Sequence, residues 1–215
     1  MGAGLVSDRP CYREKARASF VGFGFPPGQP VAVSLDGQQI ATLPANALGQ
    51  VAGAIPSLSE IPLSERARTL SMAEVANPLN TTSIVFKVTK LAVVAKLNSV
   101  RGGRSGFRAR GFYGADTAPR TLYAHVRGPR RRNVRIGRVE GPCGKVSLAK
   151  VAITRRGDPL GGYRLQFDTV RRYIGIRAAV RISGTFRIRR IFGSSSASSL
   201  FSPVPAARDS WEPDA

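Results

Sequence analysis

The chain has 215 residues, which is enough for one or two domains that each bury a core of their own. Lys and Arg number 33 against 13 Asp and Glu, so the formal net charge is +20. No apolar run reaches the roughly 18 residues that a membrane-spanning helix needs, which argues against such a span within this chain.

The charge is distributed unevenly along the sequence. Residues 97–190 carry 23 basic and 4 acidic side chains, whereas residues 1–96 carry 9 and 6. A positive field of this strength attracts anionic polymers, namely nucleic acid, phospholipid headgroups or an acidic cell-wall glycopolymer. Nearly all of the cations are Arg, so GC-rich codon usage is an alternative explanation of the excess.

The chain begins MGAGLVSDRPCY, without the basic segment and apolar core of a signal peptide. We therefore expect either a cytosolic protein or a translation start upstream of Met1. The two cysteines, Cys11 and Cys143, and the single histidine, His125, cannot supply the four ligands of a zinc site. The sequence leaves open a disulfide between Cys11 and Cys143 or two buried free thiols.

The first clear strand lies in residues 29–37. Val31, Val33 and Leu35 alternate with smaller residues, and Asp36-Gly37 then predicts a tight hairpin. Turn residues recur every 8 to 12 positions along the chain, and no window of eleven residues sustains a helical period. This pattern is typical of short antiparallel strands in a sandwich or barrel.

The last clear strand lies in residues 180–190. Val180, Ile182, Phe186 and Ile188 alternate with polar residues, so one face of this strand is apolar and the other carries arginines. The Ser/Pro-rich residues 193–215 that follow are expected to be disordered.

A repeat organises the chain. Phe20, Gly24 and Phe25 recur as Phe107, Gly111 and Phe112. Three more segments align downstream: 47–55 with 142–150, 68–72 with 163–167, and 84–89 with 178–183. A self-similarity of about 90 residues predicts two tandem all-β, Ig-like sandwich domains, residues 1–97 and 98–192, and a disordered tail, 193–215.

Catalytic and cofactor motifs are not convincing. The stretch GPCGKVS, residues 141–147, lacks the first Gly and the Ser or Thr of a phosphate-binding loop. His125 is expected on the solvent side of a strand, and the acidic residues are scattered singly. We therefore expect a protein that is not an enzyme and has no cofactor and no metal.

Two arginine-rich stretches, residues 101–114 and 127–138, favour electrostatic binding of a polyanion. The candidate residues are Arg130, Arg131, Arg132, Arg135, Arg181, Arg187 and Arg189.

Five stretches together resemble a family of tandem Ig-like repeat proteins of bacteria, of the Gly-Phe-x-Pro-Gly type. They are DRPCY (8–12), GFGFPPGQPVAVSLDG (22–37), TLYAHVRG (121–128), NVRIGRVEGPCG (133–144) and RLQFDTVRRY (164–173). The resemblance implies a secreted or surface-associated protein and brings no catalytic residues. The sequence departs from the family in lacking an export signal and in replacing the second Pro-Gly loop by YGADTAPR.

Three functions are therefore expected in decreasing order. The first is a structural or adhesive protein of the cell surface or extracellular space that binds an anionic polymer. The second is a cytosolic protein that associates with DNA or RNA. The third is an accessory module that binds polysaccharide through Tyr113, Tyr123 and Tyr173.

Overall fold

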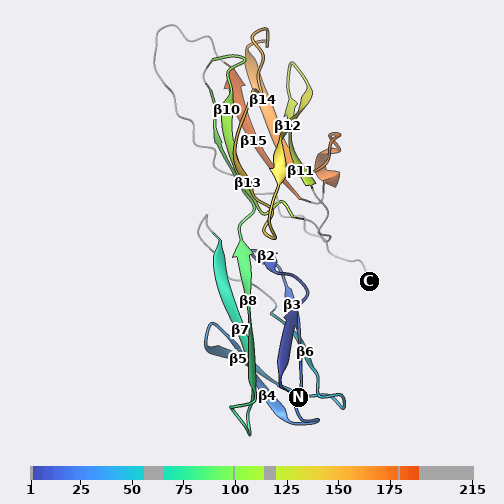
Figure 1. Cartoon of the computed structure of the whole chain (residues 1–215). Coiled ribbons are helices and arrows are strands. Elements are labelled where there is room, and N and C mark those ends of the chain that lie inside the picture. The colour runs from blue at the N-terminus through green and yellow to red at the C-terminus, as the bar shows by residue number, and fades with distance from the viewer. Residues whose placement is uncertain (1, 56–64, 99, 114–119, 179, 189–215) are drawn as a thin grey trace, which may run out of the picture. The chain divides into compact units, whose positions relative to one another are not determined.

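The computed structural model describes the chain except residues 1, 56–64, 99, 114–119, 179 and 189–215. It is an all-β protein whose described strands form four sheets (Figure 1). No helix among the described residues is long and apolar enough to cross a membrane. The predicted tail and Arg189 lie outside the described residues.

The chain divides into two compact units. Unit 1 consists of Met1–Ala92, Tyr113–Thr117 and Glu140–Lys145, and unit 2 consists of Val93–Phe112, Ala118–Val139 and Val146–Ala215. Two short segments of the second half of the chain thus belong to unit 1.

Unit 1 is built from two sheets, ordered β1-β3-β6 and β2-β8-β7-β4-β5. The strands are β1 (Gly4–Ser7), β2 (Cys11–Arg13), β3 (Ala18–Phe23), β4 (Pro30–Leu35), β5 (Gln38–Pro44), β6 (Val51–Ile55), β7 (Arg66–Glu74) and β8 (Thr81–Thr89).

Unit 2 is also built from two sheets, ordered β13-β10-β9 and β12-β11-β14-β15. The strands are β9 (Ala92–Lys96), β10 (Ser105–Arg110), β11 (Arg120–Arg127), β12 (Arg132–Val139), β13 (Val146–Val151), β14 (Gly161–Asp168) and β15 (Arg181–Ile188). A short 3-10 turn, η1 (Gly175–Arg177), lies between β14 and β15.

The sequence repeat corresponds to a repeat of strand order. The three-stranded sheets β1-β3-β6 and β9-β10-β13 match, and β8-β7-β4-β5 matches β15-β14-β11-β12. The additional strand β2 pairs in parallel with the edge strand β8, in the register Cys11 with Lys87. Both units therefore follow one plan, to which unit 1 adds a strand.

Two pairs of glycines show the repeat in the backbone. Gly24 and Gly111 have φ angles of 85° and 81°, and Gly49 and Gly144 have φ angles of 69° and 60°. Side chains other than Gly rarely adopt this left-handed region. The same two turns thus require Gly in both copies.

One aligned pair of segments is wrong. Residues 84–89 do not correspond to 178–183, because Leu70 pairs with Ile84 whereas its counterpart Leu165 pairs with Gly184. Phe86 therefore corresponds to Phe186. A shift by an even number of residues leaves the same side chains on each face of a strand, so alternation could not fix this register.

In each unit, residues of both sheets contribute to the core. In unit 2, Phe107 of β10 and Phe167 of β14 belong to different sheets, and their ring centroids lie 5.8 Å apart. In unit 1, one cluster joins both sheets: Leu5, Tyr12, Ala18, Phe20, Phe25, Val31, Val33, Ala45, Val51, Ile55, Leu70, Met72, Phe86 and Val88.

Cys11 and Cys143 form a disulfide, the first of the two alternatives that the sequence left open. Cys143 lies in the segment between β12 and β13 that belongs to unit 1, and both cysteines are buried. The two residues are 132 positions apart in sequence. A loop of this length loses enough chain entropy in the unfolded state to stabilise the fold by roughly 5 kcal/mol.

Gly49 gives a direct test of this backbone. Replacing Gly49 by Ala is expected to destabilise unit 1 by about 3 kcal/mol, because its Cβ would overlap the carbonyl oxygen of Phe25 in addition to the strained φ. The matched control is Gly28→Ala, since Gly28 has φ 75° but nothing within 4 Å of its Cβ. Urea unfolding should show a loss of only about 1 kcal/mol for the control. Equal losses for both variants would contradict the close approach at Gly49.

Candidate polyanion-binding surface

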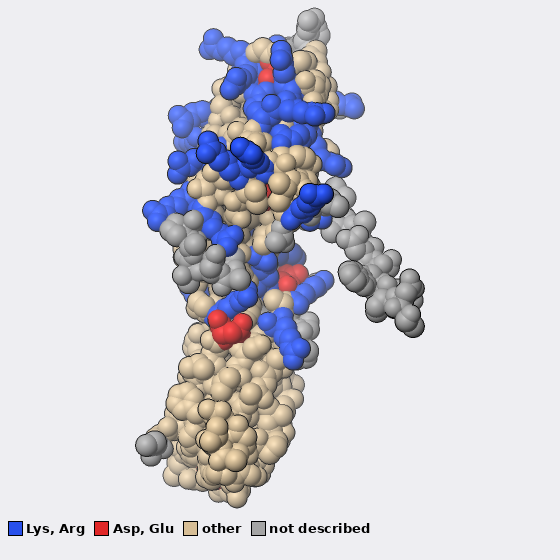
Figure 2. Space-filling view, turned by 90° about the vertical axis from the view of Figure 1, so that its right-hand side faces the viewer, with Lys and Arg blue, Asp and Glu red and all other residues tan. Residues whose placement is uncertain are grey.

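Unit 2 has only two carboxylates among its described residues, Asp158 and Asp168. Both are buried, with exposed fractions of 4% and 1%. Lys and Arg, by contrast, cover the face of unit 2 that Figure 2 presents. The described surface of unit 2 therefore offers its arginines no exposed carboxylate of the same unit.

Asp158 lies in the loop between β13 and β14 and connects three loops of unit 2. Its carboxylate accepts hydrogen bonds from the guanidinium of Arg132 and from the backbone N–H of Arg155, the latter at 2.8 Å. Its carbonyl oxygen accepts a hydrogen bond from Arg101 at 3.0 Å. Burial alone would raise the pKa of Asp158, but these bonds and the charges of Arg132 and Arg155 hold it below its usual value.

The loop between β9 and β10 packs against the segment that contains Asp158. The backbone N–H of Gly102 donates to the Thr154 hydroxyl at 3.0 Å. A Cβ at Gly102 would lie 3.2 Å from the backbone nitrogen of Arg156, so the two chains approach closely. Gly102 has a φ of 79°, which the RGGR sequence allows.

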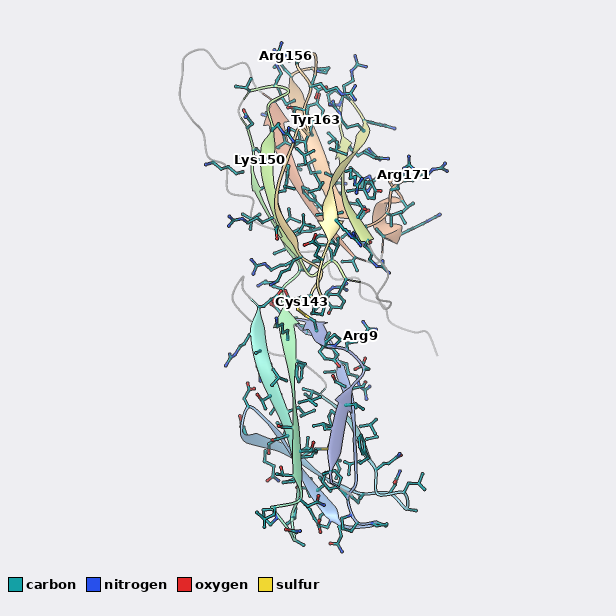
Figure 3. The ribbon with its side chains drawn as sticks, viewed as in Figure 1. Arg9, Cys143, Lys150, Arg156, Tyr163 and Arg171 are labelled. Atoms are coloured by element: carbon teal, nitrogen blue, oxygen red, sulfur yellow. A yellow bond between two sulfur atoms is a disulfide. The ribbon has the colours of Figure 1, made fainter. Side chains whose placement is uncertain are left out.

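The segment that joins β11 to the start of β12 contributes Arg130 and Arg132, and Tyr163 of β14 contacts the loop that contains Asp158. The Tyr163 hydroxyl donates to the carbonyl of Pro159 at 3.0 Å. Burial and Asp158 raise the pKa of this hydroxyl, whereas the positive charges of Arg132 and Arg130 oppose the rise. Arg130 comes two residues before Arg132 in the chain. Figure 3 shows Tyr163 and Arg156 in this part of unit 2.

We call this group the Asp158 arginine cluster. It consists of Asp158 and the arginines Arg101, Arg130, Arg132, Arg155 and Arg156. All of these arginines except Arg132 are exposed. One buried carboxylate thus holds segments that present several guanidinium groups, the side-chain group best suited to bidentate recognition of phosphate.

The arginines that the sequence predicted to bind a polyanion lie in different parts of unit 2. Arg130 and Arg132 belong to the cluster, and the exposed Arg131 lies between them in the same turn. Arg135 lies on β12, whereas Arg181 and Arg187 lie on β15 at the opposite edge of the sheet.

Sequence reasoning missed Arg155 and Arg156 and did not select Arg101. The available signal was the combination of glycine and arginine in RGGR (101–104) and TRRGD (154–158). Nothing in the sequence indicates that these segments meet, since residues 105–153 separate them.

The expectation that His125 faces solvent is wrong, because another segment of the chain covers its side chain. Its side chain is 0% exposed. Its Nε2 lies 2.9 Å from Asp168 Oδ1, and its Nδ1 lies 2.9 Å from Asn133 Oδ1. The hydrogen bonds of His125 to Asn133 and Asp168 thus connect β11, β12 and β14 on the outer face of their sheet.

The segment between β14 and β15 covers this face, which no local sequence pattern indicates. The ring of Tyr173 lies 5.6 Å from the ring of His125, and the guanidinium of Arg127 lies 4.0 Å from the centre of the Tyr173 ring. Gln166 donates to both the Asp168 carboxylate and the Gly175 carbonyl, which ties the segment to the sheet.

The three tyrosines expected to bind polysaccharide also separate. Tyr123 and Tyr173 both lie next to His125, with ring centroids at 6.4 and 5.6 Å. Tyr113 belongs to unit 1, where Arg13 stacks on its ring at 4.6 Å and donates to its carbonyl oxygen.

The described residues contain no group of three or more His, Cys, Asp or Glu that could hold a metal ion. In comparisons with known proteins, no family model matches the chain and no curated protein matches it.

The protonation of His125 is set by its neighbours. Burial alone would lower its pKa, but the hydrogen bonds to Asp168 and Asn133 raise the pKa above its ordinary value. Asn133 Oδ1 also accepts from Arg127, which identifies that atom as the oxygen, so both ring nitrogens of His125 face acceptors. Burial would raise the pKa of Asp168, but its hydrogen bonds to His125, Gln166 and Val170 lower it.

A pH titration tests this pair. A raised His125 pKa contributes stability below pH about 6.5, and this stability is lost as the pH rises through the folded pKa. The lowered pKa of Asp168 contributes stability above pH about 3.9, which is lost as the pH falls through the folded value. NMR of the single imidazole should therefore give a midpoint above 6.5, and a midpoint at or below 6.5 would refute the pair.

His125→Gln is the control for the stability measurement. In this variant the free energy of unfolding should no longer decrease as the pH rises above about 6.5. The decrease at acid pH that is due to other carboxylates should remain. Asp168→Asn is expected to destabilise unit 2 by about 3 kcal/mol in urea unfolding, because it removes a buried carboxylate that pairs with His125 and accepts hydrogen bonds from Gln166 and Val170.

Proposed function

We propose that the protein is a non-enzymatic, structural or adhesive Ig-like protein of the bacterial cell surface or extracellular space. In this proposal, unit 2 binds an anionic polymer through the Asp158 arginine cluster. The polymer carries repeated phosphate, sulfate or carboxylate groups, as cell-wall glycopolymers do.

The Ig-like part of the proposal is supported by the strand order. Each unit has a three-stranded sheet and a sheet whose four core strands follow the same sequence of neighbours, with residues of both sheets in one core. Two antiparallel sheets around a shared core are the plan of an Ig-like sandwich. We propose sandwich domains at residues 1–97 and 98–192 and a tail at 193–215; Tyr113 and residues 140–145 belong to the compact unit of the first domain.

The observation that carries the binding proposal is the burial of both described carboxylates of unit 2. None of the exposed residues Arg130, Arg155 and Arg156 is paired with a carboxylate among the described residues. Single surface cations contribute little to binding, but several on adjacent loops add their fields toward one polyanion. Binding of this kind releases counterions and weakens as salt increases.

The disulfide supports the extracellular location. Disulfides persist in oxidising compartments and are rare in the cytosol, where thiols are kept reduced. The alternative, a cytosolic protein that binds DNA or RNA, is favoured by the glycine–arginine segment at 101–104, whose guanidinium groups would meet nucleic-acid phosphates equally well. The redox state of the two cysteines separates these functions.

Alkylation of free thiols in the source cells, after acid quenching, measures that redox state. We expect Cys11 and Cys143 to be protected from alkylation until a reductant is added, because the bond forms once the chain reaches an oxidising compartment. Full alkylation without reductant would support the cytosolic alternative instead.

Polyanion binding is tested with a triple variant, Arg130→Ser, Arg155→Ser and Arg156→Ser. Affinity for heparin and for duplex DNA should fall, and the slope of log K against log salt on DNA should decrease by about 3. The matched control removes the same charge from the sheet β13-β10-β9, with Lys96→Ser, Arg108→Ser and Lys150→Ser, all of which are exposed.

The control should change the salt slope by less than the cluster variant. Equal effects would show that net charge alone drives binding and would remove the cluster from the proposal. Negligible binding of the wild-type protein at low ionic strength would overturn polyanion binding altogether.

A further inference from the structure

Unit 1 contains two β-turns that each have a leucine at the third position. The turns are Asn46-Ala47-Leu48-Gly49 and Asn77-Pro78-Leu79-Asn80. Each is closed by a backbone hydrogen bond of 2.9 Å from the fourth residue to the carbonyl of the first. In the first turn, the Asn46 side chain also accepts a hydrogen bond from the Leu48 N–H at 2.9 Å.

Both leucines point into solvent. Leu48 is 79% exposed and Leu79 is 93% exposed. The corners of turns are normally occupied by Gly, Asn, Asp or Ser, which are solvated and suit the backbone there. An apolar side chain held outward by a preformed turn, in two copies, suggests a surface that meets an apolar phase.

The two turns lie at one end of unit 1, together with the loop between β3 and β4. The Phe25 N–H donates to the Gly49 carbonyl at 3.2 Å, and the Ala45 N–H donates to the Gln29 carbonyl at 3.0 Å. The Val75 N–H donates to the Pro30 carbonyl at 3.0 Å, which brings in the second turn.

The three loops at this end of unit 1 contain no charged side chain among the described residues. Residues 23–30, 45–50 and 75–80 contain no Lys, Arg, Asp or Glu. The nearest acid along the chain, Glu74, is 7% exposed and accepts a hydrogen bond from Asn80 at 3.0 Å. On the face shown in Figure 2, blue and red side chains are absent from this part of the molecule. Phe23 and Val75 add apolar surface, at 44% and 52% exposed.

We propose that this uncharged end of unit 1 inserts Leu48 and Leu79 into the interfacial region of a neutral lipid bilayer. A fluid bilayer accepts separate protruding side chains without a matching pair of pockets. The lack of charge fits hydrocarbon, where charged side chains are expensive. The Asn and Gln side chains around the leucines would remain at the level of the headgroups.

A protein partner fits this end less well. Strong protein interfaces depend on Trp, Tyr and Arg anchors, and leucine is under-represented among them. Residues 23–30, 45–50 and 75–80 contain none of the three anchor types. The inference does not depend on the proposed polyanion binding, because it concerns unit 1 and lipid without net charge.

A tryptophan reporter gives the direct test. The chain has one Trp, Trp211, so the double variant Trp211→Phe with Leu48→Trp places a single indole at the first turn. With phosphatidylcholine vesicles in 0.5 M NaCl, we expect a blue shift of its emission and quenching by lipids brominated near the headgroup. The matched reporter is Trp211→Phe with Val85→Trp, because Val85 is 67% exposed in the middle of β8 and should show neither effect.

Flotation with the same vesicles measures the contribution of each leucine. Leu48→Asn and Leu79→Asn suit a turn and should each lower the partition coefficient about tenfold, whereas Val85→Asn should leave it unchanged. Absence of vesicle binding by the wild-type protein would overturn the proposal. Sedimentation showing a dimer that both leucine variants dissociate would overturn it as well, since the occupant would then be a second copy.

Discussion

Two buried carboxylates organise unit 2 and determine what its surface can do. Asp158 binds Arg132 and the backbone of Arg155, and its carbonyl holds Arg101, so a single residue connects three loops. Asp168 binds His125 and the N–H of Val170, which ties the segment after β14 to the sheet. Because both acids act inside the fold, the exposed arginines of unit 2 have no exposed carboxylate of their own unit among the described residues. An external anion is the partner that this imbalance favours.

The two units share a strand plan but have different surfaces. The buried positions and the left-handed glycines are repeated, as at Gly24 and Gly111. In unit 1, basic and acidic side chains form ion pairs with one another, for example Arg68 with Asp36 at 2.6 Å. The loops at one end of unit 1 contain no charged side chain among the described residues. We interpret the repeat as one plan on which two different surfaces are proposed: a cationic one for polyanions in unit 2 and an apolar one for lipid in unit 1.

Much of the backbone could be predicted from local patterns, whereas the candidate site could not. Alternation correctly placed Ile182 and Phe186 on the inner face of β15, because a strand has a period of two residues. The same period hid the true alignment of Phe86 with Phe186. His125 was expected in solvent because its strand neighbours are buried on the other face; only the tertiary fold brings Tyr173 over it. The Asp158 arginine cluster depends on segments that are distant in the chain, and a single sequence gives no distance between such segments.

We propose that unit 2 binds an anionic polymer at the Asp158 arginine cluster. Chemical-shift mapping of backbone amides, with the full chain titrated by a heparin hexasaccharide at low salt, tests this most directly. The account predicts the largest changes at residues 101–104, 128–132 and 154–158. Changes of equal size over all arginine-bearing strands of unit 2, or concentrated in unit 1, would contradict it.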